Sequence, residues 1–135
     1  LRLGRERDTL SVINDQYGAP TGAERLADVT AHAIRHLLRD ASCAGLYHLV
    51  AGGETTWHGY ASHVLARARQ AGLPIQVAAD AIHPVATSAF PTPARRPHNS
   101  RLDTHKLQTT FGLTLPHWQT GVDRMLAEIL EGQAA

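Results

Sequence analysis

Residues 9–40, TLSVINDQYGAPTGAERLADVTAHAIRHLLRD, contain the pattern that decides the fold. Residues 9–14 form a short run rich in β-branched side chains, which predicts a strand. A loop that contains glycine and proline follows this strand. Apolar residues then recur at 3.6-residue spacing, which predicts an amphipathic helix over residues 22–40 that begins near Thr21 and ends around Asp40. The apolar face of this helix consists of Leu26, Val29, Ala33, Ile34, Leu37 and Leu38.

The same order of elements is repeated further along the chain. Residues 45–51, GLYHLVA, are mostly apolar, which predicts a strand buried on both faces, as in a parallel sheet. Residues 57–72 are expected to form a helix capped by Thr55 or Thr56. The buried stripe of this helix would consist of Tyr60, Ala61, Val64, Leu65 and Ala68. A third short strand is predicted over residues 74–80, and this alternation favours an α/β fold with crossover connections.

Two helices are predicted near the end of the chain. The first covers residues 105–111, with Asp103 or Thr104 as its cap and Gly112 at its end. The second covers residues 117–132 and follows a proline, which is favoured in the first turn of a helix. Its apolar face would consist of Trp118, Val122, Met125, Leu126 and Ile129.

Between these elements lies a long segment, residues 87–100, TSAFPTPARRPHNS. It holds three prolines and has neither a strand period nor a helix period, so we expect an ordered, proline-stiffened binding loop. Arg95 and Arg96 precede Pro97 in this loop. Two guanidinium groups on a stiff loop can bind phosphate oxygens in a bidentate manner, but an ordinary pair of surface arginines fits the sequence equally well.

Composition describes one globular domain or a piece of a larger one. The 135 residues are 43% hydrophobic and 19% charged, and no run of 18 apolar residues could span a membrane. The formal net charge is only +1, and the basic residues form no patch or stripe, which disfavours a nucleic-acid partner. The single cysteine, Cys43, cannot form an internal disulfide, which fits the reducing cytoplasm. The only methionine is Met125, and the opening LRLGRERD is typical of the tail of a helix, so we expect that further sequence precedes Leu1.

Other polar and glycine residues invite functional hypotheses that the sequence supports weakly. His32 and His36 are spaced i, i+4 and could share a metal, but no third ligand is nearby, and a solvated helix edge explains them better. Cys43 fits a buried thiol better than a nucleophile. The turn at Gly52 and Gly53 joins a predicted strand to a predicted helix, yet it matches no phosphate-binding motif, so a plain tight turn is favoured.

Asp15 and Gln16 stand where the first strand gives way to a loop, which is the usual place for ligand contacts in open α/β sheets. An Asx-type turn is the alternative for this position. The chain lacks the glycine-rich turn of a dinucleotide-binding site. It also lacks a Tyr-x-x-x-Lys pair, because Tyr17, Tyr47 and Tyr60 are followed four residues later by Thr21, Ala51 and Val64. The sequence by itself shows no catalytic machinery.

Four stretches nevertheless resemble one enzyme family. They are SVINDQYGAPTGAERLADV (11–29), GLYHLVAGGETTWHGYA (45–61), VATSAFPTPARRPHNSRLDTHKLQTTFGL (85–113) and WQTGVDRML (118–126). In this order they resemble the C-terminal part of the dTDP-4-dehydrorhamnose reductases, which are extended short-chain dehydrogenases/reductases. The resemblance covers nearly the whole chain and implies a Rossmann-like α/β fold in which residues 1–135 are the substrate-binding portion.

The resemblance further implies a reaction and a set of site residues. The intact enzyme would use NADPH or NADH to reduce C4 of dTDP-4-dehydro-L-rhamnose, with the cofactor and a proton-donating tyrosine held by an N-terminal region absent from this chain. Arg96 first and Arg95 second would approach the diphosphate. Asp15, Gln16 and Thr21 would line the same cleft.

The resemblance also bears on a possible metal site and on the oligomeric state. Glu24 and Glu128 resemble positions at which some family members hold Mg²⁺ between subunits, although both also fit ordinary helix-surface acids. A chain of this kind without its N-terminal region would expose a strand edge and an apolar face, so we expect a homo-oligomer. A non-catalytic nucleotide-sugar-binding or oligomerisation module is the alternative to the enzyme.

Overall fold

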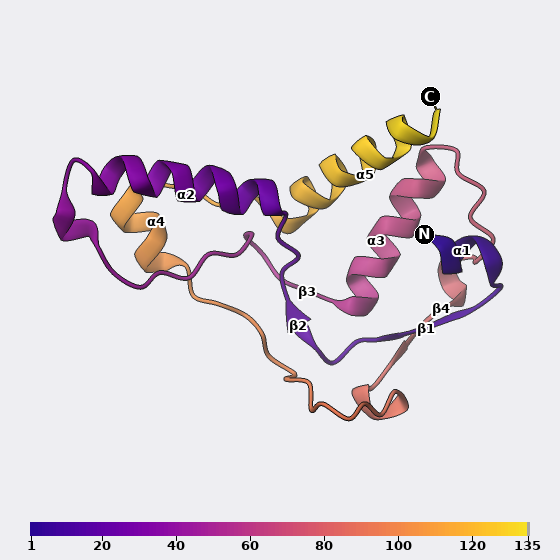
Figure 1. Cartoon of the computed structure of the whole chain (residues 1–135). Coiled ribbons are helices and arrows are strands. Elements are labelled where there is room, and N and C mark those ends of the chain that lie inside the picture. The colour runs from indigo at the N-terminus through magenta and orange to yellow at the C-terminus, as the bar shows by residue number, and fades with distance from the viewer. Residues whose placement is uncertain (135) are drawn as a thin grey trace.

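The computed structural model describes residues 1–134, which form two lobes (Figure 1). One lobe contains the helices α2 (Ala23–Leu37) and α4 (His105–Phe111). The other contains α1 (Arg2–Glu6), α3 (Trp57–Gln70), α5 (Trp118–Ala134), and the strands β1 (Leu10–Ile13) and β4 (Ile82–Val85). A short antiparallel pairing of β2 (Tyr17–Gly18) with β3 (Thr55–Thr56) lies between the lobes. No helix within residues 1–134 is long and apolar enough to cross a membrane.

The α/β prediction is confirmed by a parallel pair of strands. β1 pairs with β4 in the register Leu10↔Ile82 to Ile13↔Val85, and the chain passes through α2 and α3 between them. Since parallel strands cannot be joined by a tight turn, this long crossover is what the pairing requires. The carboxyl ends of both strands therefore meet at one edge, where the predicted ligand contacts begin.

Two of the three predicted strands are wrong. Residues 45–51 form no strand, because they pair with no other strand of the described chain. Their end is instead held by the hydrogen bond from Ala51 N to Thr21 Oγ1 (2.9 Å). Nor is this segment buried on both faces, since Leu46 is 79% exposed. Residues 74–80 also form no strand, because the Gly4 carbonyl binds the amides of Gln76 and Val77 and β4 begins only at Ile82.

The helix α2 is shorter and less covered than predicted. It ends at Leu37, and Asp40 instead caps the 3₁₀ turn η1 (Ala41–Cys43) by accepting from Ser42 N. Thr21 is not its cap, because Gly22 holds that position without a side-chain hydrogen bond. Of its apolar face only Val29 is buried; the exposed members are Leu26, Ile34, Leu37 and Leu38.

The predicted helix that follows the glycine pair is confirmed as α3. Thr56 caps it by accepting a hydrogen bond from Gly59 N (3.1 Å), as a threonine at this position should. Its stripe packs inward at Val64, Leu65 and Ala68, and α5 lies alongside it. The predicted apolar face of α5 is only partly buried: Trp118, Val122 and Leu126 are buried, whereas Met125 and Ile129 are exposed.

The short predicted helices are present as well. α4 ends at Gly112, whose φ of +61° is the left-handed conformation that a glycine adopts after a helix. Thr104 holds the cap position at its start without a side-chain hydrogen bond, and the preceding Asp103 accepts from His105 N (2.8 Å). The helical character predicted for the opening residues corresponds to α1.

Among the described residues, the buried apolar side chains form three small clusters. The first joins α2 to α4, the second joins α3 to α5, and the third joins α3 to β4. Their buried members are Val29, Leu107, Phe111 and Leu115; Val64, Trp118, Val122 and Leu126; and Leu65, Val77 and Ile82. The two lobes share none of these clusters.

Candidate functional site

Polar residues that follow β1 and β4 meet at the carboxyl edge of this strand pair. Asn14 N continues the ladder by donating to Val85 O (2.9 Å). Directly beyond it, Asp15 and Gln16 both reach Thr87, the second residue after β4. This edge is the usual address of a ligand site in an α/β fold.

The Asp15 carboxylate accepts hydrogen bonds from Thr87. It accepts from Thr87 N at 2.9 and 3.0 Å through its two oxygens, and from the Thr87 hydroxyl at 2.6 Å. These bonds hold the pKa of the Asp15 carboxyl below its ordinary value, because they favour the charged form. The Asp15 side chain thus binds the first residue of the turn η3 (Thr87–Ala89), 72 residues away along the chain.

The Gln16 side chain also forms hydrogen bonds within the fold. Its amide nitrogen donates to Thr87 Oγ1 (3.1 Å), and its amide oxygen accepts from the indole N–H of Trp57 (3.2 Å). Close by, the Thr56 hydroxyl donates to Asn14 Oδ1 (2.6 Å), so the N-terminal end of α3 is tied to the end of β1. The Trp57 side chain itself remains 57% exposed.

A second set of contacts attaches the end of the predicted binding loop. Tyr17 N donates to His98 O and Ser100 N donates to Tyr17 O, both at 2.8 Å. The His98 ring donates from Nδ1 to the Asp15 carbonyl (2.8 Å), and the same nitrogen lies 3.6 Å from the Asp15 carboxylate. The two ends of the loop formed by residues 88–97 are therefore both attached to residues 15–17.

Arg95 and Arg96 lie between these two attachments. Both are exposed, and neither makes a hydrogen bond or an ion pair with the described residues. Arg101, in contrast, donates to Glu54 Oε2 (2.8 Å) and lies over the ring of Tyr17. Arg95 and Arg96 thus have no carboxylate partner in the described chain, whereas the charge of Arg101 is neutralised by Glu54.

Thr21 is the fifth residue of the predicted cleft, and its hydroxyl is occupied. It donates to Ala19 O (3.1 Å) and accepts from Ala51 N (2.9 Å), which holds the segment before β3 against the loop after β2. Of the five predicted substrate residues, three therefore use their polar atoms within the fold. The two arginines do not.

The glycine turn does not fit the phosphates of a dinucleotide. Gly52 N donates to Pro116 O (2.8 Å), and Gly52 O accepts from Trp118 N (2.9 Å), so its backbone groups are satisfied by the chain itself. A Cβ at Gly53 would collide with the His117 ring. The turn packs against the start of α5, and residues 1–134 hold no glycine-rich turn for a nicotinamide cofactor.

The residues considered for metals are placed as structural groups. Glu128 pairs with Arg124 on α5 (3.1 Å), and Glu24 lies in the first turn of α2, where a negative charge is favourable. His32 contacts the Phe111 carbonyl (2.9 Å) and links α2 to α4. No three potential ligands gather anywhere in the described chain, and nothing there supports the predicted magnesium ion.

Cys43 lies in the α2–α4 lobe and is only partly buried. Burial raises the pKa of its thiol, and the neighbouring Asp40 carboxylate, 3.7 Å from the sulfur, raises it further. A thiol in such surroundings stays protonated, which disfavours a nucleophilic role.

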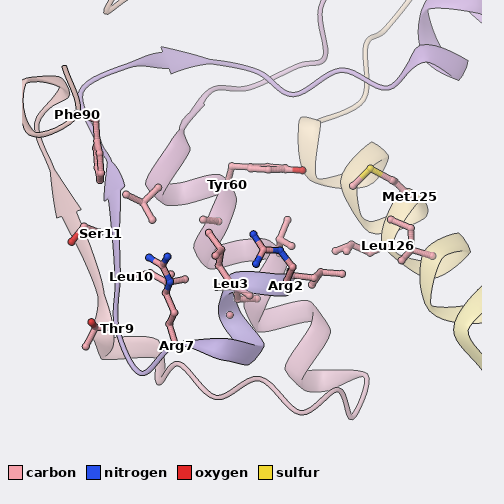
Figure 2. A pocket seen from close by; sticks show the side chains of 17 residues that line it. Arg2, Leu3, Arg7, Thr9, Leu10, Ser11, Tyr60, Phe90, Met125 and Leu126 are labelled. Carbon is pink, nitrogen blue, oxygen red and sulfur yellow. The ribbon is translucent and has the colours of Figure 1, made fainter. Parts of the chain in front are cut away.

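An open apolar groove of about 960 Å³ lies beside α1 and β1. Figure 2 shows side chains of α1, β1, α3 and α5 around it, with Phe90 at one end. Two arginines, Arg2 and Arg7, stand among apolar walls. None of the five predicted substrate residues lines this groove.

Comparison with known proteins places the chain in a family. The family model described as the RmlD substrate binding domain matches residues 1–131. The chain belongs to this family. The resemblance found in the sequence motifs is thereby confirmed, and the described domain accounts for nearly the whole chain.

Relatives of the domain are named reductases. It is 62% identical over 129 residues to the dTDP-4-dehydrorhamnose reductase of Shigella flexneri and 64% identical over 129 residues to that of Salmonella typhimurium. Each match covers 96% of this chain but 42% of the relative. The domain thus spans less than half the length of these proteins.

Solved structures confirm the fold class. A dTDP-4-dehydrorhamnose reductase from Bacillus anthracis, crystallised in complex with NADP, is 31% identical with a TM-score of 0.75 and covers 94% of this chain and 41% of that one. An orthologue from Clostridium acetobutylicum is 28% identical with the same TM-score, over 96% of this chain and 41% of that one. The domain therefore has the α/β fold of a part of these reductases.

Thr87 and His98 escaped the sequence reasoning, although they form most of the contacts at the site. The position of Thr87 after a strand could have identified it from the sequence. It follows β4 much as Asp15 follows β1, so a strand placed at residues 82–85 would have brought both to one edge. The prediction put that strand at residues 74–80, and the pairing was lost.

Proposed function

We propose that this chain is the nucleotide-sugar-binding part of a dTDP-4-dehydrorhamnose reductase. The supporting observation is the identity of 61–64% to four relatives that carry this name. The whole enzyme would reduce the C4 carbonyl of dTDP-4-dehydro-L-rhamnose, with hydride supplied by NADPH or NADH and a proton from a tyrosine outside this chain. We place this activity in the cytoplasm, where the lone Cys43 would stay reduced.

The chain's own contribution would be to grip the diphosphate. Arg95 and Arg96 are exposed and unpaired in the described structure, so no internal carboxylate competes for their charge. A guanidinium group binds two phosphate oxygens at once, and such charged hydrogen bonds are about twice as strong as neutral ones. The chain by itself should bind without turnover, since the glycine-rich turn and the Tyr-x-x-x-Lys pair are missing from it.

A chimera tests this function. The chain would replace the matching 129 residues of the Escherichia coli reductase, to which it is 61% identical. We expect the chimera to oxidise NADPH in the presence of dTDP-4-dehydrorhamnose, followed by absorbance at 340 nm. We expect Arg95→Ala combined with Arg96→Ala to raise KM about ten-fold or more, because each lost charged hydrogen bond contributes about 1.5–3 kcal/mol.

The matched control is Arg39→Ala, which removes an exposed arginine just beyond the C-terminal end of α2. KM should stay unchanged in this variant. A folded chimera that shows no turnover would contradict the proposed reaction. An active chimera whose KM is unchanged by Arg95→Ala combined with Arg96→Ala would contradict the placement of the diphosphate.

The alternative, a binding or oligomerisation module without catalysis, draws support from the exposed apolar residues of α2. It predicts a folded chimera without turnover. Self-association of the 135-residue chain is expected for either function and does not separate them.

A further inference from the structure

The loop of residues 88–97, here called the arginine loop, is attached at both ends to one short segment of the chain. Its first end is held where Thr87 binds Asp15 and Gln16 through four hydrogen bonds. Its second end is held where His98 binds Asp15 and Tyr17. Three consecutive residues after β1 thus clamp a loop that begins and ends more than 70 residues later in the sequence.

Within the loop, few internal bonds restrain the chain. The Thr92 hydroxyl donates to Ala94 O (2.7 Å), and residues 91–97 are all exposed. Pro91, Pro93 and Pro97 limit the backbone freedom that remains. The position of Arg95 and Arg96 therefore depends on the attachments at the loop ends.

The environment of Asp15 argues against direct contact with a phosphate. A carboxylate that faced a diphosphate would repel it, and this carboxylate already accepts three hydrogen bonds from Thr87. The same charge is useful as an anchor, because bonds from N–H and O–H donors to an ionised acceptor are strong.

On this basis we propose that Asp15, together with Thr87 and His98, positions the arginine loop for diphosphate binding without touching the diphosphate. This inference rests on the proposed function, and it assigns Asp15 a role different from the cleft-lining one predicted from the sequence. A loop fixed at both ends loses less conformational entropy when its arginines bind, so affinity should fall when an anchor is removed.

A double-mutant cycle distinguishes positioning from contact. In the chimera, Thr87→Val removes the hydroxyl at constant volume, whereas Thr87→Ser retains it. We expect Thr87→Val to raise the inhibition constant of dTDP and the KM of the substrate about five-fold with kcat little changed, and Thr87→Ser to restore both. In the Arg95→Ala, Arg96→Ala background, Thr87→Val should have no further effect, because there is nothing left to position.

A variant at the second end of the arginine loop provides an independent test in case Thr87→Val does not fold. His98 is an exposed side chain, so His98→Ala should fold, and it should show the same dependence on the arginines. Additive effects in the cycle, or unchanged dTDP affinity in both Thr87→Val and His98→Ala, would overturn the proposal. If the arginines themselves prove irrelevant to dTDP, the proposed function fails instead.

Limited proteolysis of the 135-residue chain gives a readout that needs neither ligand nor activity. Trypsin can cut after Arg95 but not after Arg96, which precedes proline. We expect Thr87→Val and His98→Ala to speed the cut after Arg95 about five-fold, while the cut after Arg39 keeps its rate. Equal acceleration at both sites would indicate general destabilisation and would overturn a local anchoring role.

Discussion

At the scale of single residues, Asp15 links acidity to stability. Its pKa is lowered in the folded chain from the ordinary value of 3.8, chiefly by the hydrogen bonds from Thr87. A carboxyl with a lowered pKa stabilises the fold fully above its unfolded pKa, and this contribution is lost as pH falls through the folded pKa. The anchor should therefore weaken in acid, below about pH 4.

Asp15→Asn tests this dependence. We expect the variant to be less stable than the parent chain at pH 6 and the gap to narrow progressively as the pH falls below about 3.8, because the lowered pKa of Asp15 makes its contribution fade as the folded chain takes up the proton. Urea denaturation at several pH values measures the gap. Asp28→Asn, which changes an exposed carboxyl on α2, should show no such gap. A gap that stays constant from pH 6 to pH 2.5 would refute the role of the charge.

The residue scale also shows what a sequence can and cannot reveal about a site. Asp15, Gln16 and the arginine pair could be located, because their types and their places after a strand or in a proline-rich loop are local features. Their partners could not. Gln16 and Thr87 are 71 residues apart, and only the pairing of β1 with β4 brings them together.

At the scale of elements, replacing two helix glycines by alanine should change the free energy of unfolding in opposite directions. Gly112 ends α4 with a φ of +61°, so Gly112→Ala should lower the free energy of unfolding by about 1 kcal/mol. Gly121 lies inside α5, and an added Cβ there meets no atom within 4 Å, so Gly121→Ala should raise it by about 0.5–1 kcal/mol. Urea denaturation of both variants measures the two changes. A neutral Gly112→Ala would show that this helix end tolerates a side chain.

Helices were predicted better than strands for a physical reason. The residues of α3 and α4 carry their own period, cap and stop signals, so neighbours are not needed to recognise them. A strand is defined by the partner it pairs with. Residues 45–51 have strand-like composition and remain unpaired in the described chain, whereas β4, which contains a proline and an exposed histidine, pairs with β1.

At the scale of the whole molecule, exposed apolar residues favour association. Ile34 on α2 is 52% exposed, and Leu38, which directly follows α2, is 83% exposed. We expect light scattering at high concentration to give a mass above the 14.6 kDa of one chain. Ile34→Glu combined with Leu38→Glu should restore the monomer mass.

Arg35→Glu is the control for that experiment. It changes the net charge by the same two units at an exposed position next to this face, so it should leave the association intact. A parent chain that is monomeric at every concentration would contradict the prediction.

The absence of a shared core between the lobes has a consequence for cooperativity. The α2–α4 cluster rests on Val29, Leu107, Phe111 and Leu115, and no member of it packs into the clusters around α3. Amide protons of α2 and α4 should therefore exchange with deuterium through an opening that leaves α3 and α5 protected. Uniform exchange across all four helices would mean that the chain unfolds as a single unit despite its divided interior.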